Sequence, residues 1–338
     1  SHEMRTPLNG IIGMADLLQD SELQDKQKKQ TQTIKTSGKN LLSIINDVLD
    51  FSKIEAGEFT LNPHYANLSA SLYECLEVVS HTAYSKGLEL ILDMPMNFLE
   101  LIEIDDLRVK QVILNLLNNA IKFTSSGYIK IEVKQEKLKD DVVEISLKIK
   151  DTGIGIKKEN IQRIFDSFAQ EDSSTTRVYG GTGLGLTIAK QIIQSMRGDI
   201  HVVSQPDFGS EFSIRFSCRA KFEMQAYQQP NSLSGLCVLV INMNALNAEI
   251  FSNMLLFWGV EVRLVAPDEL ASGRLKEVIG EKPLDLIWYD ENISNTLEKE
   301  MLAYLPQAGD KQPLMVKQCY FETKPPHSVH VSLIKPVS

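Results

Sequence analysis

The sequence predicts a multidomain chain with an all-α helical hairpin, an α+β sandwich and an α/β domain built on a doubly wound parallel sheet. Three observations lead to this prediction. Apolar residues recur at helical spacing through residues 1–57, helices mix with antiparallel strands up to about residue 220, and strands alternate with helices after residue 235. The chain has 338 residues, which is enough for two or three domains with separate cores.

Residues 1–60 predict a hairpin of two helices. Apolar side chains lie at helical spacing from Met4 to Leu18 and again from Leu41 to Leu49, and the polar residues 20–27 form the loop between them. Neither helix can cover its own apolar stripe. We therefore expect a homodimer in which two hairpins build a four-helix bundle.

Residues 61–222 predict the α+β sandwich. A helix capped by Asn67 or Ser69 is followed by two strands, a long helix that starts near Asp105, and a strand hairpin over residues 128–151. A short helix at about residues 158–165, a helix at about 184–196 and a last strand hairpin complete this unit. Helices and strands in this order predict one layer of each.

The remaining chain predicts a linker and a third domain. Residues 223–235 lack periodicity and are rich in Gln, Pro, Ser and Gly, which is typical of a linker. Strands and helices alternate over residues 236–338, and this pattern predicts the doubly wound parallel sheet.

The composition excludes several classes of function. Hydrophobic residues make up 43% and charged residues 23%, so wholesale disorder is excluded. A formal net charge of −9 argues against nucleic acid as a partner and against direct membrane contact, and no run of residues approaches the roughly 18 apolar residues of a membrane span. The four cysteines form no CxxC pair and the six histidines form no HxxxH pattern, so a disulfide framework or a metalloenzyme is not expected.

The first candidate motif is His2 beside Glu3 at the start of the chain, with Thr6 one turn further along. An imidazole next to a carboxylate can act as a nucleophile when the carboxylate accepts its proton. Taken alone, a histidine near a helix start is more often an ordinary surface residue.

The second motif is a set of polar residues on one face of the long helix. Asn115 and Asn119 are four residues apart and share their face with Lys122. Amide oxygens can bind Mg²⁺, and a lysine can contact phosphates as a point charge. A solvated helix face would have the same composition, so this motif alone decides nothing.

Glycine-rich segments form the third group of motifs. Asp151 ends a strand and is followed by Gly153 and Gly155, so its carboxylate could accept from an adenine amino group while the backbone approaches the ring. Residues 180–186 place four glycines before a helix, where backbone amides can hold phosphate. This run is neither a Rossmann fingerprint nor a P-loop. Phe165 and Phe168 precede it, and packing in the core is their simplest interpretation.

In this order the motifs resemble those of the sensor histidine kinases of two-component signalling, over about residues 1–220. The resemblance implies a phosphotransfer hairpin followed by an ATP-binding domain of the Hsp90/gyrase/histidine-kinase type. It implies that His2 accepts the phosphoryl group and that Glu3 accepts the imidazole proton. Thr6 completes an HExxT pattern that, in this family, also positions water to dephosphorylate a partner's phospho-aspartate.

The resemblance also assigns ATP and Mg²⁺ to the second domain. It makes Asn119 the Mg²⁺ ligand, supported by Asn115, with Lys122 on the phosphates and Asp151 at the adenine. The other positions that it assigns to ATP binding are Gly153, Gly155, Phe165, Phe168, Gly181, Thr182, Gly183, Leu184 and Gly185. The sequence departs mildly from the family at Asp105-Asp106, where Asp-Pro is frequent, and this changes only the helix start.

The third domain resembles a response-regulator receiver domain of flavodoxin-like fold. Asp290 matches the phospho-acceptor position and Lys335, before Pro336, matches the last motif. The acidic pair of that family falls on Asn242 and Met243, and the hydroxyl position falls near Gln318. These changes weaken the Mg²⁺ site. We therefore expect an unreactive carboxylate in a surface pocket at Asp290, and a pseudo-receiver that serves for docking.

This domain order resembles hybrid or tripartite kinases of the GacS/BarA type. In those proteins a competent receiver domain and a histidine phosphotransfer domain follow. We therefore expect a receiver domain, in a hybrid kinase or a response regulator, as the phosphoryl acceptor, and a phosphotransfer domain as a further partner. Both ends look cut from a longer protein: the pseudo-receiver lacks its last helix, this part should be cytoplasmic, and the full-length protein should be anchored in the inner membrane.

Two other functions compete with the kinase. A catalytically silent signalling scaffold would act by docking partners, but His2, Asn119 and the lid glycines are intact. An ATPase clamp of the Hsp90, gyrase or MutL kind shares the Asn and Gly motifs but lacks the upstream His hairpin. A Ser/Thr kinase is excluded because the chain has no HRD, DFG or VAIK motif.

Overall fold

The computed structural model describes residues 2–95, 98, 101–168, 183–221, 233–242, 244–266, 284–290, 293, 299, 313–319 and 331–334. The predicted site residues Gly181, Thr182 and Lys335 lie outside the described residues, as do Met243 and most of the predicted linker. The side chain of His2 also lies outside the description, although its backbone is the first residue of a helix.

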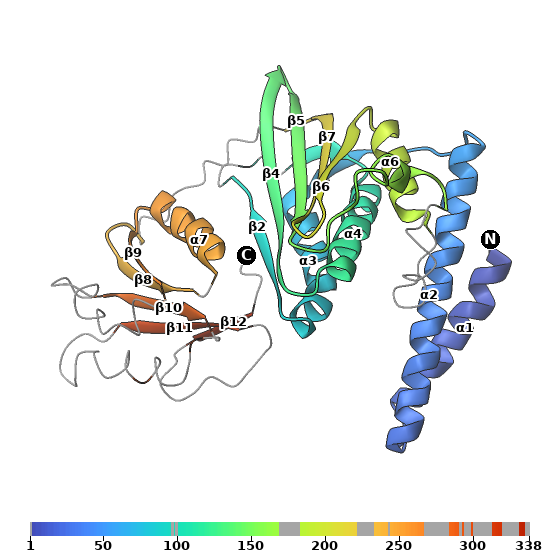
Figure 1. The fold of residues 1–338 in the computed structure, drawn as a ribbon, viewed down its shortest axis with the longest axis horizontal. Coiled ribbons are helices and arrows are strands. Elements are labelled where there is room, and N and C mark those ends of the chain that lie inside the picture. Colours follow the sequence, from blue (N-terminus) through green and yellow to red (C-terminus); the bar gives the residue numbers. More distant parts are fainter. Residues whose placement is uncertain are drawn as a thin grey trace.

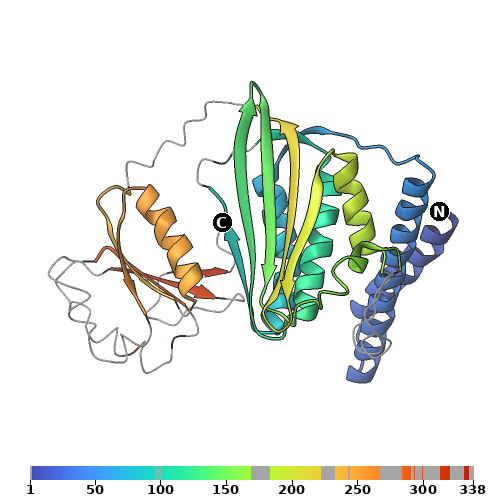
Figure 2. The ribbon, with the colours of Figure 1, turned by 45° about the horizontal axis from the view of Figure 1, so that its top comes forward.

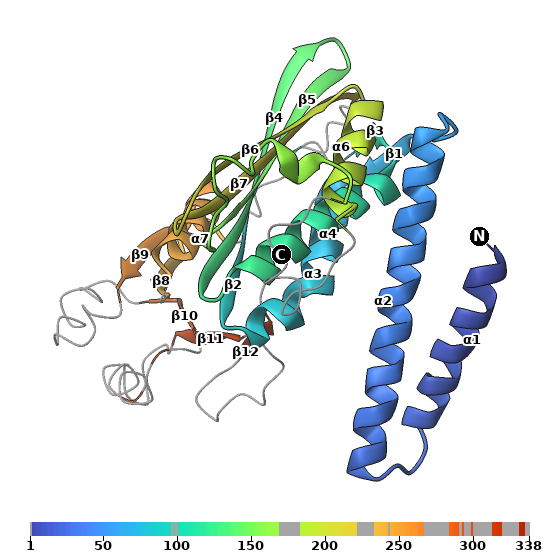
Figure 3. The same ribbon diagram turned by 45° about the vertical axis from the view of Figure 1, so that its right-hand side comes forward.

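The predicted hairpin is formed by α1 (His2–Gln19) and α2 (Asp25–Glu55), which pack against each other, while the end of α2 extends beyond α1 (Figure 3). Leu8 and Ala15 of α1 are buried, as are Thr31 and Gly38 of α2. A methyl group on Gly38 would lie 2.9 Å from Cγ1 of Ile12, so the small residue lets the two helices approach closely. Other apolar side chains of the hairpin are exposed, among them Met14, Leu17 and Ile34, while Phe51 and Ile54 pack against the core of the next domain.

The second domain has one layer of helices and one five-stranded sheet, as predicted (Figure 2). Its sheet order is β2-β4-β5-β7-β6, with β2 and β4 parallel and the other pairs antiparallel. A separate pair of strands, β1 and β3, is antiparallel. The elements are β1 (His64–Asn67), α3 (Leu68–Ser85), β2 (Leu88–Asp93), β3 (Leu101–Ile104), α4 (Asp106–Phe123), β4 (Gly127–Lys139), β5 (Val142–Asp151), η1 (Arg163–Phe165), α6 (Gly185–Ser195), β6 (Asp199–Gln205) and β7 (Gly209–Arg219).

Local sequence signals explain where the helices of this domain begin. The side chain of Asn67 accepts a hydrogen bond from the backbone of Ala70 at 2.9 Å and caps α3. Asp105 caps α4 in the same way through the backbone of Arg108 at 3.1 Å. Asp105 therefore supplies the helix start that the family's Asp-Pro would otherwise give.

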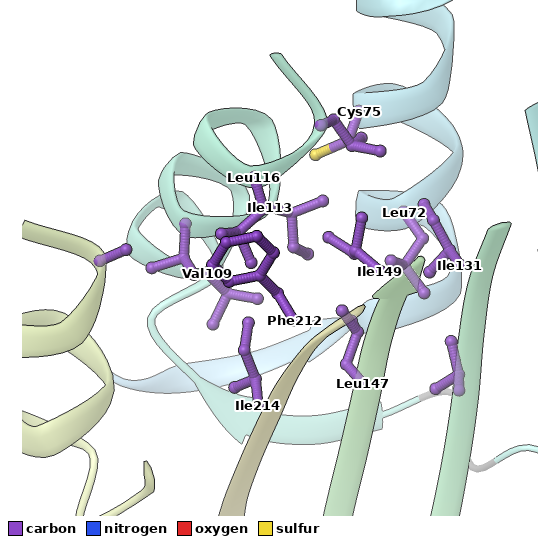
Figure 4. Close-up of a cluster of buried hydrophobic side chains, with 14 of the residues drawn as sticks. Leu72, Cys75, Val109, Ile113, Leu116, Ile131, Leu147, Ile149, Phe212 and Ile214 are labelled. Atoms are coloured by element: carbon purple, nitrogen blue, oxygen red, sulfur yellow. The ribbon is translucent and has the colours of Figure 1, made fainter. Parts of the chain in front are cut away.

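The core of this domain lies between the helices and the sheet (Figure 4). Alternate residues of β5 point into it, so the buried strand face follows the period-two pattern of the sequence. Leucine, isoleucine and valine side chains from α3 and α4 meet those of β4, β5 and β7, among them Leu72, Val109, Ile113, Leu116, Ile131, Leu147, Ile149 and Ile214. This packing fixes the height of α4 above the sheet, and thereby the position of its polar face.

The helix expected at residues 158–165 is wrong in its extent. The segment is a series of turns that ends in the single 3-10 turn η1. Asn160 accepts from the backbone of both Arg163 and Ile164, and it donates its own N–H to Lys157 at 2.9 Å. These short-range bonds take the place of a continuous helical ladder.

The third domain contains a five-stranded parallel sheet in the order β12-β11-β10-β8-β9 (Figure 1). This is the strand order of a flavodoxin-like sheet, as predicted. Its described helix, α7, packs its Leu255 against Val238, Val240 and Val260. The elements are β8 (Cys237–Ile241), α7 (Ala245–Phe257), β9 (Glu261–Val265), β10 (Leu286–Asp290), β11 (Leu314–Cys319) and β12 (Val331–Ile334).

Candidate functional site

The polar face of α4 forms one wall of the candidate site. Asn115, Asn119 and Lys122 are half-buried on this face, because the opposite face of the helix packs into the core. Burial lowers the pKa of Lys122. The Nδ2 atom of Asn115 is buried, and no described residue accepts a hydrogen bond from it. A buried amide without a hydrogen-bond partner destabilises the folded protein. This face of α4 therefore carries a donor that no described residue satisfies.

Gly185 brings the start of α6 close to this wall. A methyl group on Gly185 would overlap the side-chain oxygen of Asn115. The preceding residue, Leu184, is buried and occupies the N-cap position of α6, and Gly183 adopts the left-handed conformation at φ +69°. The amides at the start of α6 therefore lie beside the Asn115 amide, where a helix start favours an anion.

Asp151 ends β5 and is 5% exposed. Its Oδ1 accepts from the backbone N–H of Gly153 at 2.8 Å and of Ser210 at 3.3 Å. Burial raises the pKa of Asp151, against the effect of these two donors. Both described donors reach Oδ1, so Oδ2 is the atom placed to accept from a ligand. Sequence reasoning missed Ser210, which lies 59 residues away on another strand.

The loop after β5 is tied to the end of α4. The backbone N–H of Ile154 donates to the carbonyl of Phe123 at 3.2 Å, and the N–H of Asp207 donates to the carbonyl of Ile154 at 2.8 Å. A methyl group on Gly153 would lie 2.5 Å from the Phe123 oxygen, and one on Gly155 would overlap the Gln205 carbonyl. At both positions the backbone of another segment lies where a side chain would be, so both predicted glycines are required.

The two predicted phenylalanines differ in their environment. Phe165 is half-buried, contacts the Phe212 ring edge-on with centroids 6.5 Å apart, and has Lys190 over its ring at 5.4 Å. Phe168 is 63% exposed, so the core interpretation is wrong for this residue. Its N–H donates to the Gly183 carbonyl at 3.2 Å, and its ring meets Phe51 of α2 at 6.0 Å.

The histidine motif lies on the other unit, at the start of α1. His2 is its first residue, and Glu3 and Thr6 are exposed. Thr6 follows His2 by four residues, so the two share a helix face. The structure thus brings the Asn, Asp, Phe and described Gly motifs together in one domain and leaves the histidine motif on the hairpin.

The exposed face of the hairpin is strongly apolar. Met14 and Leu17 are each 66% exposed, and Ile11 is 51% exposed. A shallow apolar groove runs along this face and is lined by Pro7, Gly10, Ile11, Met14, Ala15, Leu18 and Ile34. Among the described helices, none is long and apolar enough to cross a membrane.

The C-terminal sheet has a polar cluster at the carboxyl ends of its strands. Gln318 lies opposite Asp290 in the register of β10 and β11. Its Oε1 accepts from Nε1 of Trp288 at 3.2 Å and from Nδ2 of Asn242 at 3.4 Å. The Asp290 side chain is fully buried, so the expected surface pocket at this position is wrong.

The hairpin and the α+β domain define two domain families. Residues 1–57 match the His Kinase A (phospho-acceptor) domain, and residues 104–220 match the histidine kinase-, DNA gyrase B- and HSP90-like ATPases. The second family is an ATPase family, in agreement with the polar groups that α4, the start of α6 and the end of β5 present in this domain. The chain carries the two signature domains of histidine kinases, and the resemblance to sensor histidine kinases is confirmed.

Hybrid sensor kinases are among the relatives of this chain. It is 42% identical over 256 residues to the signal transduction histidine-protein kinase BarA of Escherichia coli (strain K12), which covers 71% of this chain and 28% of BarA. It is 41% identical over 267 residues to the sensor histidine kinase GacS of Pseudomonas protegens, covering 78% of this chain and 29% of GacS. The chain therefore spans less than a third of the length of these two relatives.

A solved structure resembles the whole described arrangement. Full-length ShkA, solved in complex with AMPPNP, superposes with a TM-score of 0.71 at 26% identity, and the match covers 100% of this chain and 68% of ShkA. The helical hairpin and the α+β domain predicted from the sequence are thereby shared with a known histidine kinase structure.

Proposed function

We propose that this chain is the catalytic part of an ATP-dependent protein-histidine kinase that phosphorylates its own His2. The phosphoryl group then passes to an aspartate of a receiver domain. The observation that carries this proposal is a buried, unsatisfied amide group in the α+β domain. There a buried amide of Asn115 without a described partner lies beside the start of α6, in the domain where Asp151 offers a buried carboxylate oxygen. The ShkA complex with AMPPNP, an ATP analogue, supports the same ligand class.

Each side chain of the pocket has a defined task in this proposal. Asp151 Oδ2 accepts from the 6-amino group of adenine, and Lys122 contacts the phosphates. The amides at the start of α6 hold phosphate oxygens through the positive end of the helix. Positioning and charge neutralisation supply the rate of phosphoryl transfer, because this chemistry needs little covalent help from the protein.

The residues also fit Mg²⁺. Asn119, with Asn115 beside it, offers the hard amide oxygens that this ion accepts. No cluster of three or more His, Cys, Asp or Glu side chains occurs in the described part of the chain, so phosphate oxygens would have to complete the shell. When bound, Mg²⁺ neutralises charge on the phosphates. Asn119 and Asn115 hold and orient it.

The transfer step uses the hairpin. A nitrogen of His2 attacks the γ-phosphorus, the bond to the β–γ bridging oxygen breaks, and ADP leaves. Glu3 accepts the proton from the other imidazole nitrogen, so the phosphohistidine is neutral at the ring. The group then passes to an aspartate carboxylate of a receiver domain. Thr6 places a water for the reverse task of dephosphorylating that aspartate.

Two substitutions test the kinase assignment by labelling with [γ-³²P]ATP. His2→Gln should abolish acid-labile label while ADP binding stays intact. Asn119→Asp should abolish both, because a carboxylate in place of the amide repels the phosphates. Asn118→Asp is the matched control, since Asn118 is exposed on the same helix turn. Label that survives in His2→Gln would show that another residue is the acceptor.

We also propose that the active form is a homodimer. Supporting this are the 66% exposure of Met14 and Leu17 and the apolar groove along α1 and α2, which a second hairpin would cover. Leu17→Glu should shift the mass measured by light scattering from dimer to monomer. Lys29→Glu, on an exposed polar position of α2, should leave the dimer intact. A dimer that persists in Leu17→Glu would contradict this interface.

A further inference from the structure

Thr124 carries a buried hydroxyl group without a described partner. The residue follows α4 directly, is 1% exposed, and donates its backbone N–H to the carbonyl of Ala120 at 3.0 Å. Its Oγ1 is buried, and no described residue forms a hydrogen bond with it. A buried hydroxyl left in this state destabilises the folded protein, so the position calls for an explanation.

The other buried threonines show what a satisfied hydroxyl looks like in this chain. Thr31 donates its hydroxyl to the carbonyl of Gln27 at 2.9 Å. Thr187 donates to the carbonyl of Phe165 at 3.0 Å. In both cases the partner is a nearby backbone carbonyl. Thr124 is the exception among the buried threonines in the described part of the chain.

The position of the Thr124 hydroxyl relates it to the carboxylate of Asp151. A methyl group on Gly153 would lie 2.9 Å from Thr124 Oγ1 and 2.8 Å from Asp151 Oδ1. Two atoms that both lie within 2.9 Å of one point are less than about 6 Å apart. One water molecule or one edge of a planar ring can span such a separation.

The polar atoms near the Thr124 hydroxyl already have hydrogen-bond partners. Asp151 Oδ1 accepts from the N–H groups of Gly153 and Ser210, and the carbonyl of Phe123 accepts from the N–H of Ile154. The Thr124 hydroxyl is therefore the group here that still has both its donor and its acceptor capacity to offer.

We propose that Thr124 is a base-recognition residue of the nucleotide pocket. Its hydroxyl obtains a partner when the base enters, either the ring edge or a water held against that edge. The inference rests on the proposed ATP site. A hydroxyl can donate to a ring nitrogen while Asp151 accepts from the exocyclic amino group. The acceptor-only carboxylate distinguishes a 6-aminopurine from a 6-oxopurine, and the hydroxyl adds affinity for the ring edge.

The test measures ADP and IDP affinity of the full 338-residue chain by titration calorimetry, together with thermal unfolding without nucleotide. Thr124→Val keeps the shape and removes the hydroxyl, and Thr124→Ser keeps the hydroxyl. We expect Thr124→Val to bind ADP about tenfold more weakly while the preference for ADP over IDP, which Asp151 sets, remains, with Thr124→Ser within about threefold of the unaltered chain. Without nucleotide, Thr124→Val should unfold at the same or a higher temperature, because it removes an unsatisfied group.

Two results would overturn the inference. In the first, Thr124→Val binds ADP as tightly as the unaltered chain. In the second, Thr124→Val unfolds at a lower temperature without nucleotide and Thr124→Ser does not, which would mean that a permanent water makes the hydroxyl structural. An unaltered chain that fails to bind ADP would contradict the proposed function itself, so the two failures are distinguishable.

Discussion

Oδ2 of Asp50 lies 2.7 Å from a terminal nitrogen of Arg108, and this ion pair joins α2 of the hairpin to α4 of the ATP-binding domain. The same oxygen accepts from Nε2 of Gln111 at 3.0 Å, and the Arg108 guanidinium lies 5.0 Å from the centre of the Phe59 ring. Both charged side chains are less than a quarter exposed, so salt screens them weakly. Together with the ring contact between Phe51 and Phe168, this pair holds the end of α2 against the domain (Figure 1).

We expect Asp50→Asn to loosen this junction without harming the pocket. The substitution removes the charge from a partly buried, doubly hydrogen-bonded carboxylate, at a cost of about 1–3 kcal/mol to interdomain docking. Small-angle scattering should show a larger radius of gyration, and ADP affinity should not change. Glu74→Gln is the control, because it breaks an ion pair with Lys110 at 3.0 Å within one domain. An unchanged radius for Asp50→Asn would contradict a role in docking.

Alanine substitutions at Gly87 and Gly155 separate the cost of a left-handed backbone from the cost of a steric clash. Both adopt left-handed conformations, at φ +68° and +72°. A methyl group on Gly87 meets nothing within 4 Å, whereas one on Gly155 overlaps the carbonyl of Gln205. We expect Gly87→Ala to cost about 1–2 kcal/mol of stability and Gly155→Ala about 1–3 kcal/mol more. Urea unfolding measures the loss of stability in both variants. Equal losses would mean that the loop at Gly155 shifts to relieve the clash without cost.

Local sequence patterns located most of the helices and strands of the α+β domain. Helical spacing located α4, and the same spacing placed Asn115, Asn119 and Lys122 on one face. Local rules succeeded here because each motif lies within one element. They failed at residues 158–165, where turn bonds to Asn160 prevail over helix formation.

Contacts between distant segments could not be predicted from local patterns. Ser210 reaches Asp151 only because β7 pairs with β5, and Asp50 reaches Arg108 only because the hairpin folds back onto the domain. Phe168 follows the same logic, since its exposed ring finds its partner on α2. Such pairs depend on tertiary packing, which periodicity within one element does not describe.

Asp151 should give the nucleotide-free chain a specific pH dependence. Burial raises its pKa in the folded domain above the unfolded value of about 4, so the folded state binds the extra proton between these two values. The contribution of Asp151 to the free energy of unfolding therefore falls as the pH rises from about 4 through the folded pKa. Above the folded pKa, the destabilisation by the buried, charged carboxylate is complete. Asp151→Asn removes this decline, because an amide can accept the same two N–H bonds without carrying charge.

The measurement is urea unfolding of both chains across that pH range, without nucleotide. The stability of Asp151→Asn relative to the unaltered chain should increase with pH, while ADP binding is lost by at least about a hundredfold. Asp140→Asn, at an exposed turn position, is the comparison substitution. A relative stability of Asp151→Asn that stays level with pH would mean that burial does not govern the Asp151 carboxyl.

Asp290 should take no part in phosphoryl transfer. Its side chain is fully buried, and the facing position of β11 is occupied by Gln318, whose Oε1 is bound by Trp288 and Asn242. A phosphoryl donor cannot reach a carboxylate closed off in this way. The amides that replace the acidic and hydroxyl positions also offer Mg²⁺ fewer charged ligands than carboxylates would.

Base-labile phosphate on the chain measures this directly. After incubation with ATP, the base-labile label should be the same in Asp290→Asn as in the unaltered chain. A receiver domain from an active response regulator, added to the same reaction, should acquire such label and thereby show that phosphohistidine is available. Gln318→Ala should leave the indole N–H of Trp288 unpaired and cost about 1–3 kcal/mol of stability in the C-terminal domain. If the base-labile label disappears in Asp290→Asn, Asp290 is phosphorylated in the unaltered chain. The carboxylate would then have to become accessible to a phosphoryl donor through movement of Asn242 and Gln318.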